Sequence, residues 1–462
     1  MKDTENDDVF SFANSSYVDE LFLSYKNNPT SVDATWRAYF EGFHKGFAQA
    51  AKIAENVPGF NEVLNTLAHS NENKISVQLI NKDTTELINS VDKTFEFNVA
   101  KMVKAYKKFG HLKAKTNPLF ALSEKAKGII DLKYFDLTSA DLERTTHAGI
   151  LIGDTSPCLL KELIEKLEFI FCESVGAELD HILCHDETAW LYQEFYASRV
   201  KKPEQNTQKS IYLELAKADA LEKTIATKYI GKKRFSIEGA DSQIVACESF
   251  IDESCRLGVE EVTVAIAHRG RLNFLVNVIG KPLERLLAEW EGYPHEDLQG
   301  DCDVKYHYGY ESIRKSRNGK EFRVSLPFNP SHLEYVTSVV MGDTRARQAV
   351  YHASDTSKVA SIVFHGDAAV AAQGIVFETV QMMSLRGYSV GGTVHVVANN
   401  QVGFTTNPKD ARSSTYCTDV AKVTNSPVFH VNCDDLEALH NVMELAARYR
   451  EKFKKDIYID IL

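Results

Sequence analysis

The sequence predicts an α/β fold in which a mostly parallel sheet is flanked by helices. Three observations support this prediction. Short β-branched runs alternate with helical segments in the second half of the 462-residue chain, as they do in strand–helix–strand units. Polar turns containing glycine or asparagine follow two of these runs, where open sheets of this kind bind ligands. The composition, 44% hydrophobic and 25% charged, is that of ordinary globular domains.

Five apolar runs are the expected strands of this sheet. They cover Val262–Ala267, Val359–Phe364, Thr393–Ala398, Val428–Val431 and Tyr458–Leu462. We expect one helix from Gly366 to about Leu385, and a second from Asp434, a good N-cap residue, to about Lys454. These elements make up an α/β domain over 226–462.

The first half of the chain has mainly helical periodicity. Apolar residues at helical spacing predict a small helical arm over 1–47, and a polar, weakly periodic stretch predicts a flexible linker over 48–94. A mainly helical region is expected over 95–225, and its first helix is expected to end at Gly110. The arm either docks on its own chain or binds a partner.

Charge and composition exclude several classes of function. With 53 basic against 64 acidic residues the net charge is −11, which disfavours binding to nucleic acid. No apolar run approaches the roughly 18–20 residues that cross a membrane. The eight cysteines are scattered without zinc-type spacing, and the acidic N-terminus has neither a secretory nor a transit pattern. We therefore expect a reduced, cytoplasmic protein.

Two polar turns carry the strongest chemical signal. Residues 366–369 read Gly-Asp-Ala-Ala and residues 399–403 read Asn-Asn-Gln-Val-Gly, and each turn follows an expected strand. A right-handed crossover between those strands places Asp367 and Asn400 side by side, although they are 33 positions apart. Their oxygens, with the carbonyl of Val402, suit Mg²⁺, and the small residues after the aspartate leave room for a diphosphate.

These residues resemble a known family. Gly-Asp followed about thirty residues later by Asn-Asn is similar to the motif that binds thiamin diphosphate and Mg²⁺. The stretch over 366–420 resembles the decarboxylating component of the 2-oxoglutarate dehydrogenases, in which alanine stands at position 368 where other members have glycine. Further similar stretches are NNPTSVDATWRAYF (27–40), AYKKFGHLKAKTNPL (105–119), KRFSIEGAD (233–241), AIAHRGRLNFLVNVIGK (265–281), DVKYHYG (303–309) and FNPSHLE (328–334).

The resemblance implies a role for each matching site residue. It implies Mg²⁺ ligation by Asp367, Asn400 and the carbonyl of Val402. It implies a cofactor-lining position for Ser331, His332 and Leu333, and a place beside the diphosphate for Ala368. Arg269 would bind phosphate or carboxylate, and His268 and His307 would be the active-site histidines.

Other basic residues near these stretches have a structural interpretation. His365, His395 and His430 lie within or at the ends of expected strands, and we interpret them as packed or hydrogen-bonded core residues. Lys305 and Arg271 either steer an anionic substrate or belong to a solvated basic face.

The resemblance also implies a reaction and partners. The expected activity is oxidative decarboxylation of 2-oxoglutarate, with succinyl transfer to the lipoyl domain of a dihydrolipoyl succinyltransferase, in the tricarboxylic acid cycle. Dihydrolipoyl dehydrogenase would be the third component of the complex. A homodimer is expected, and the N-terminal arm resembles the segment that binds the other components.

The family needs a second half of the fold, which holds the aminopyrimidine of the cofactor. Nothing in the sequence resembles that half, so we expect 226–462 to be incomplete at its C-terminal end. Two alternatives follow: a non-catalytic half-site or assembly module, and a 2-oxoadipate dehydrogenase. The reading frame after Leu462 distinguishes the first from an enzyme, and decarboxylation of both acids by the full-length protein distinguishes the second.

Overall fold

The computed structural model describes residues 92–293 and 304–462, together with 25, 28–32 and 37. Residues 93–462 form one compact unit. The expected arm over 1–47 and linker over 48–94 therefore lie almost wholly outside the described residues. Among those residues, no helix combines the length and the apolar character that crossing a bilayer requires.

The core of the unit is an eight-stranded sheet with the order β3-β9-β10-β8-β7-β4-β6-β5. The six central strands are parallel, and the two edge strands β3 and β5 are antiparallel to their neighbours. This confirms the predicted fold class. In chain order the strands are β3 (Val175–Glu178), β4 (Glu261–Ile266), β5 (Tyr310–Lys315), β6 (Glu321–Leu326), β7 (Val359–Gly366), β8 (Thr393–Ala398), β9 (Val428–Val431) and β10 (Ile457–Ile461).

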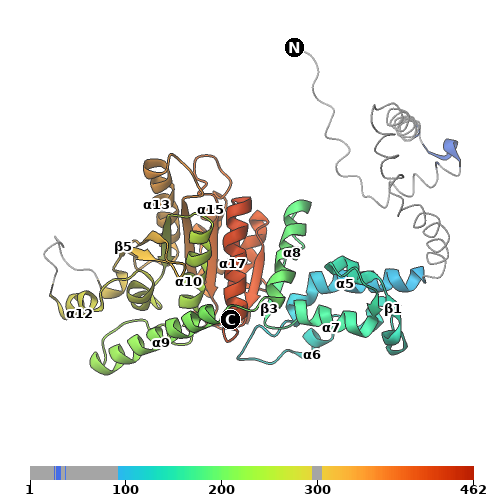
Figure 1. Ribbon diagram of the computed structural model, residues 1–462, viewed down its shortest axis with the longest axis horizontal. Helices are drawn as coiled ribbons and strands as arrows, with labels where there is room; N and C mark the ends of the chain where they lie inside the picture. The colour runs from blue at the N-terminus through green and yellow to red at the C-terminus, as the bar shows by residue number, and fades with distance from the viewer. Residues whose placement is uncertain (1–24, 26–27, 33–36, 38–91, 294–303) are drawn as a thin grey trace, which may run out of the picture. The chain divides into compact units, whose positions relative to one another are not determined.

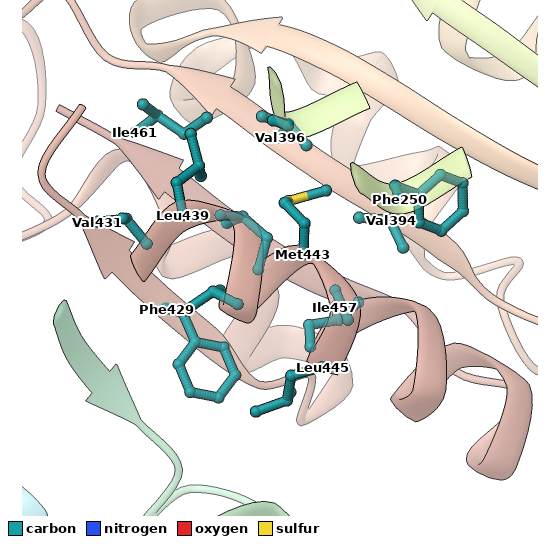
Figure 2. Close-up of a cluster of buried hydrophobic side chains, with 14 of the residues drawn as sticks. Phe250, Val394, Val396, Phe429, Val431, Leu439, Met443, Leu445, Ile457 and Ile461 are labelled. Atoms are coloured by element: carbon teal, nitrogen blue, oxygen red, sulfur yellow. The ribbon is translucent and has the colours of Figure 1, made fainter. Parts of the chain in front are cut away.

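Helices cover both faces of the sheet because successive strand residues point to opposite sides. On β4, Val264 belongs to the large core beneath α10 (Ser242–Arg256) and α17 (Leu436–Phe453), whereas Ala265 packs with Val336 and Val340 of α13 (Tyr335–Tyr351). Figure 1 shows α17 lying alongside the strands, and Figure 2 shows its apolar side chains gathered against strand side chains such as Val394 and Val396. The sheet is thus buried on both sides, which explains its continuous apolar runs.

The N-terminal part of the unit consists mainly of helices. They are α5 (Lys93–Lys113), α7 (Leu160–Phe171), α8 (His185–Val200) and α9 (Gln205–Lys228). The region that we expected to be mainly helical also contributes β3, which pairs with β9 at the sheet edge. We predicted that Gly110 ends its helix, and this prediction is wrong. Gly110 lies inside α5, where a Cβ atom would come within 2.7 Å of Phe171 Cβ, so glycine permits the close approach of two helices.

Shorter elements complete the unit. They are α6 (Glu124–Lys127), β1 (Thr145–Thr146), β2 (Cys158–Leu159), α11 (Arg271–Asn273), α12 (Leu283–Glu291), α14 (Asp367–Ala372), α15 (Gly374–Val380) and α16 (Pro408–Ala411). The helix predicted from Gly366 to about Leu385 is divided, because Gln373 has extended backbone between α14 and α15. The cap of α17 is Asp435 rather than the predicted Asp434: its carboxylate accepts a hydrogen bond from the Ala438 N–H at 3.0 Å.

Candidate functional site

A cavity of about 810 Å³ lies at the carboxyl ends of β4, β7 and β8. The chain runs from β4 outward to β6 and then returns across β4 to β7, so the direction of strand succession reverses between β4 and β7. Ligands of open α/β sheets bind at such a reversal, because the loops on either side of it diverge and leave a crevice.

Three oxygen-bearing groups meet at the mouth of this cavity. One terminal atom of the Asn400 amide lies 3.2 Å from Asp367 Oδ1 and 3.1 Å from the carbonyl oxygen of Val402. With nitrogen at that position the amide donates to both oxygens. With oxygen there, three oxygens converge. Ligands about 2.1 Å from an octahedral Mg²⁺ lie about 3 Å from one another, so this spacing fits the cation.

Asp367 is a buried carboxyl group with one cationic neighbour. The side chain is buried, and burial raises the pKa of its carboxyl group. Arg412 is a distant partner, with Nη1 3.5 Å from Asp367 Oδ2. The adjoining loop packs tightly, because a Cβ atom on Gly403 would come within 2.5 Å of Ala368 Cβ. The small residues at both positions let this loop lie close to the start of α14.

The two predicted active-site histidines are in contact. Nε2 of His268 lies 3.1 Å from Nε2 of His307, and the His268 ring also packs beside Phe235 and Tyr306. Partial burial, the neighbouring His307 and the cationic Arg271 and Lys233 lower the pKa of His268 to about 4. His268 lines the cavity and is neutral near pH 7, so it can accept or donate a hydrogen bond there.

Arg271 has a role that neither sequence interpretation foresaw. Its side chain is fully buried and is neither solvated nor directed at a substrate. Nε donates to the Tyr308 carbonyl at 2.9 Å, Nη1 donates to the Ile266 carbonyl at 2.6 Å, and Nη2 donates to the Pro327 carbonyl. Burial lowers the pKa of Arg271 to about 9. The guanidinium thereby joins the segments that carry the two predicted active-site histidines.

The remaining predicted residues divide into two groups. Arg269 and Leu333 line the cavity, as do Asp367, Ala368, Asn400 and Val402. Ser331 and His332 are exposed and are not among the lining residues, so the structure does not bring them to the cavity. Lys305 is half-buried beside Tyr308, with its Nζ 3.4 Å from the tyrosine hydroxyl.

We did not predict a buried polar chain that begins at the cavity lining with Glu334 and His365. Glu334, which lines the cavity, has Oε2 2.6 Å from His365 Nδ1, and His365 Nε2 lies 2.9 Å from His395 Nδ1. His395 Nε2 is 3.5 Å from Asp456 Oδ2. Both histidines are buried and hydrogen-bonded, in agreement with their structural interpretation. Glu334 ends the quoted stretch FNPSHLE, but its left-handed backbone, with φ 71°, could not be foreseen.

Fold and cavity together define an α/β protein with a cavity at the carboxyl ends of parallel strands. Residues 215–462 match the family model described as "Dehydrogenase E1 component", and residues 7–46 match "2-oxoglutarate dehydrogenase N-terminus". The chain belongs to the dehydrogenase E1 component family, which depends on thiamin diphosphate.

Curated relatives are similar along nearly the whole chain. The chain is 39% identical to the 2-oxoglutarate dehydrogenase E1 component of Azotobacter vinelandii and 38% identical to that of Haemophilus influenzae, each alignment covering 97% of this chain and 47% of the relative. It is 36% identical to the mitochondrial 2-oxoglutarate dehydrogenase of Schizosaccharomyces pombe, over 99% of this chain and 45% of the relative. The chain thus spans about half the length of these relatives.

Proposed function

We propose that this chain forms the Mg²⁺- and diphosphate-binding half of a thiamin diphosphate site, and that the full-length protein oxidatively decarboxylates 2-oxoglutarate. The observation that carries the proposal is the convergence of the Asn400 amide, the Asp367 carboxylate and the Val402 carbonyl beside the cavity. Asp367 and Asn400 follow neighbouring parallel strands, so the sheet itself sets their separation. These three residues would hold Mg²⁺, and Ala368 would lie beside the diphosphate.

The cationic and neutral basic groups of the cavity suit a 2-oxo acid. Thiamin diphosphate supplies an electron sink for decarboxylation when bound. Arg269 offers a planar fork for a carboxylate. His268 and His307 would orient the substrate and move protons. His268, whose pKa lies below neutrality, is a ready hydrogen-bond acceptor.

The partners belong to the same proposal. Relatives similar over nearly the whole chain are named as E1 components of 2-oxoglutarate dehydrogenase. We infer that the lipoyl group of a dihydrolipoyl succinyltransferase accepts the succinyl unit, and that residues 7–46 take part in binding that component. Dihydrolipoyl dehydrogenase and a second copy of this chain complete the proposed assembly.

Titration calorimetry and turnover on the full-length protein test the proposal. We expect Mg²⁺-dependent binding of thiamin diphosphate, and Asp367→Ala should weaken it by at least about 100-fold, since even outer-shell changes at metal sites cost about 10–100-fold. Asp410→Ala, an exposed aspartate on α16, is the control and should bind normally. Unchanged affinity in Asp367→Ala would refute the ligand assignment. A clear preference for 2-oxoadipate over 2-oxoglutarate would refute the assignment of 2-oxoglutarate as the substrate.

A further inference from the structure

A second group of buried ionisable residues lies near the β3 edge of the sheet, where β3, β9 and β10 are neighbours. His268 follows β4, which lies toward the other edge. His430 of β9 has Nδ1 2.8 Å from Asp460 Oδ2 of β10 and Nε2 3.0 Å from Glu178 Oε1 of β3. All three side chains are buried. The strand register brings them together, because residue 430 pairs with residue 176 on one side and with residue 460 on the other.

This cluster does not have the character of a second metal site. His111, Glu178 and His430 offer ligand atoms within 4.8 Å of one another. However, Lys422 Nζ already lies 2.7 Å from Glu178 Oε2, and the hydrogen bonds to Glu178 and Asp460 keep His430 positively charged despite its burial. These two cations already neutralise the carboxylates, so a metal ion would have to displace both of them.

The cluster instead leads to the turn that carries the proposed Mg²⁺ ligands. Asp460 Oδ1 accepts a hydrogen bond from Asn399 Nδ2 at 3.0 Å. The Asn399 backbone N–H donates to the Ile461 carbonyl at 2.9 Å, and Asn399 Oδ1 lies 3.3 Å from the Gln401 N–H. Asn399 is therefore held from β10 on one side and holds the residue after Asn400 on the other.

Gln401 needs such support because its backbone is in the left-handed region, with φ 60°, which costs free energy for a residue with a Cβ atom. A second contact comes from the loop after α5. Asn117 Nδ2 donates to Gln401 Oε1 at 2.7 Å, and Gln401 Nε2 donates to Asn117 Oδ1 at 3.2 Å. Two connections from the region before residue 180 thus converge on one turn, one through the side chain of residue 399 and one through that of residue 401.

We propose that Asn117 and Glu178 are positioning residues for the Mg²⁺-binding turn over 399–402. Glu178 acts through His430, Asp460 and Asn399, and Asn117 acts directly on Gln401. The part of the chain between residues 93 and 180 would then set the geometry of a site to which it contributes no lining residue. This inference rests on the proposed function, since it assumes that Asp367, Asn400 and Val402 bind Mg²⁺.

The test is a mutant cycle read out as affinity for thiamin diphosphate at saturating Mg²⁺ on the full-length protein, by calorimetry. Asn117→Ala and Gln401→Ala should each weaken binding by about 10–100-fold, the effect typical of outer-shell residues. The double variant should be no weaker than either single variant, because both remove the same contact. Additive losses, or no loss in Asn117→Ala, would overturn the direct connection.

Glu178→Gln tests the buried connection and should also weaken binding by about 10-fold or more. Its matched control is Glu173→Gln, which removes the exposed ion pair with Lys115 in the same region and should leave affinity unchanged. Normal affinity in a folded Glu178→Gln variant would overturn this part. If Glu178→Gln does not fold, the Asn117 cycle decides. If the wild-type protein does not bind the cofactor, the proposed function is wrong. If every variant binds it normally, only the positioning role is wrong.

Discussion

Two groups of histidines in this protein show how the same side chain acquires different charge states. His268 and His307 contact each other beside the cavity, with Arg271 and Lys233 as cationic neighbours. His430 lies between the carboxylates of Asp460 and Glu178. Partial burial and like charges lower the pKa of His268 to about 4. At His430 burial also opposes charge, but hydrogen bonds and charges from the two carboxylates outweigh it and raise the pKa to about 9.

The difference in pKa distinguishes His268, which is available for chemistry, from His430, which stabilises the fold. A neutral imidazole at the cavity can exchange protons or hydrogen bonds with a ligand. A buried imidazolium between two carboxylates is committed to them, and removing it leaves uncompensated buried charge. The pKa of Glu178 is shifted by the same cluster. Burial raises it, but His430, His111 and Lys422 outweigh burial and lower it to about 2.

Replacing His268 should produce the largest change. We expect His268→Gln to lower turnover by about 10²–10⁴-fold, the usual contribution of a positioned acid or base. Cofactor affinity and the thermal unfolding midpoint should change little, because the side chain is only partly buried. His185→Gln, an exposed histidine on α8, is the control. Normal turnover in His268→Gln would remove this residue from the mechanism.

Replacing His430 should reverse that pattern. His430→Gln should lower the free energy of unfolding by about 3–5 kcal/mol, as when one partner of a buried ion pair is removed. Denaturant unfolding of the purified chain measures the effect. A loss below about 1 kcal/mol, the size expected for an exposed pair, would show that the carboxylates are not committed to this histidine.

Arg271→Lys tests what holds the cavity pair in place. A lysine ammonium cannot reach three carbonyls in the plane of a guanidinium, so about 1–3 kcal/mol of stability should be lost as buried acceptors go unsatisfied. The fall in turnover should exceed that of Arg269→Lys measured at saturating substrate, if alignment of the histidines is what Arg271 provides. Equal stability in Arg271→Lys and wild type would contradict the role.

Titration should show the smallest and most direct contrast. By NMR of labelled imidazoles, we expect a midpoint near pH 4 for His268 and near pH 9 for His430. The stabilisation from His430 is complete below about pH 6.5, where the unfolded chain is also protonated, and is lost as pH rises through 9. For His268, stability falls as pH drops from 6.5 toward 4, since only the unfolded state then gains a proton. Midpoints between pH 6 and 7 for both His268 and His430 would contradict the proposed difference in their charge states.

Much of the fold and of the candidate site could be predicted from local sequence. The central strands are buried on both faces and therefore appear as continuous β-branched runs, and the turns after β7 and β8 carry Asp367 and Asn400. Strands β3, β5 and β6 were missed. β5 lies at the sheet edge with alternate residues exposed, so it has no apolar run. Gly110 was misplaced because the packing of α5 against Phe171 is not visible in the sequence around it.

By itself the sequence determined the fold class, the crossover between β7 and β8, and hence the meeting of Asp367, Asn400 and Val402. These follow from side-chain periodicity and from the fixed handedness of parallel connections, which are local properties of the chain. Only the tertiary structure decided that Arg271 is buried and that His268 is neutral while His430 is charged. A charge state depends on which distant groups surround a side chain, and those groups here come from strands and loops far apart in the chain.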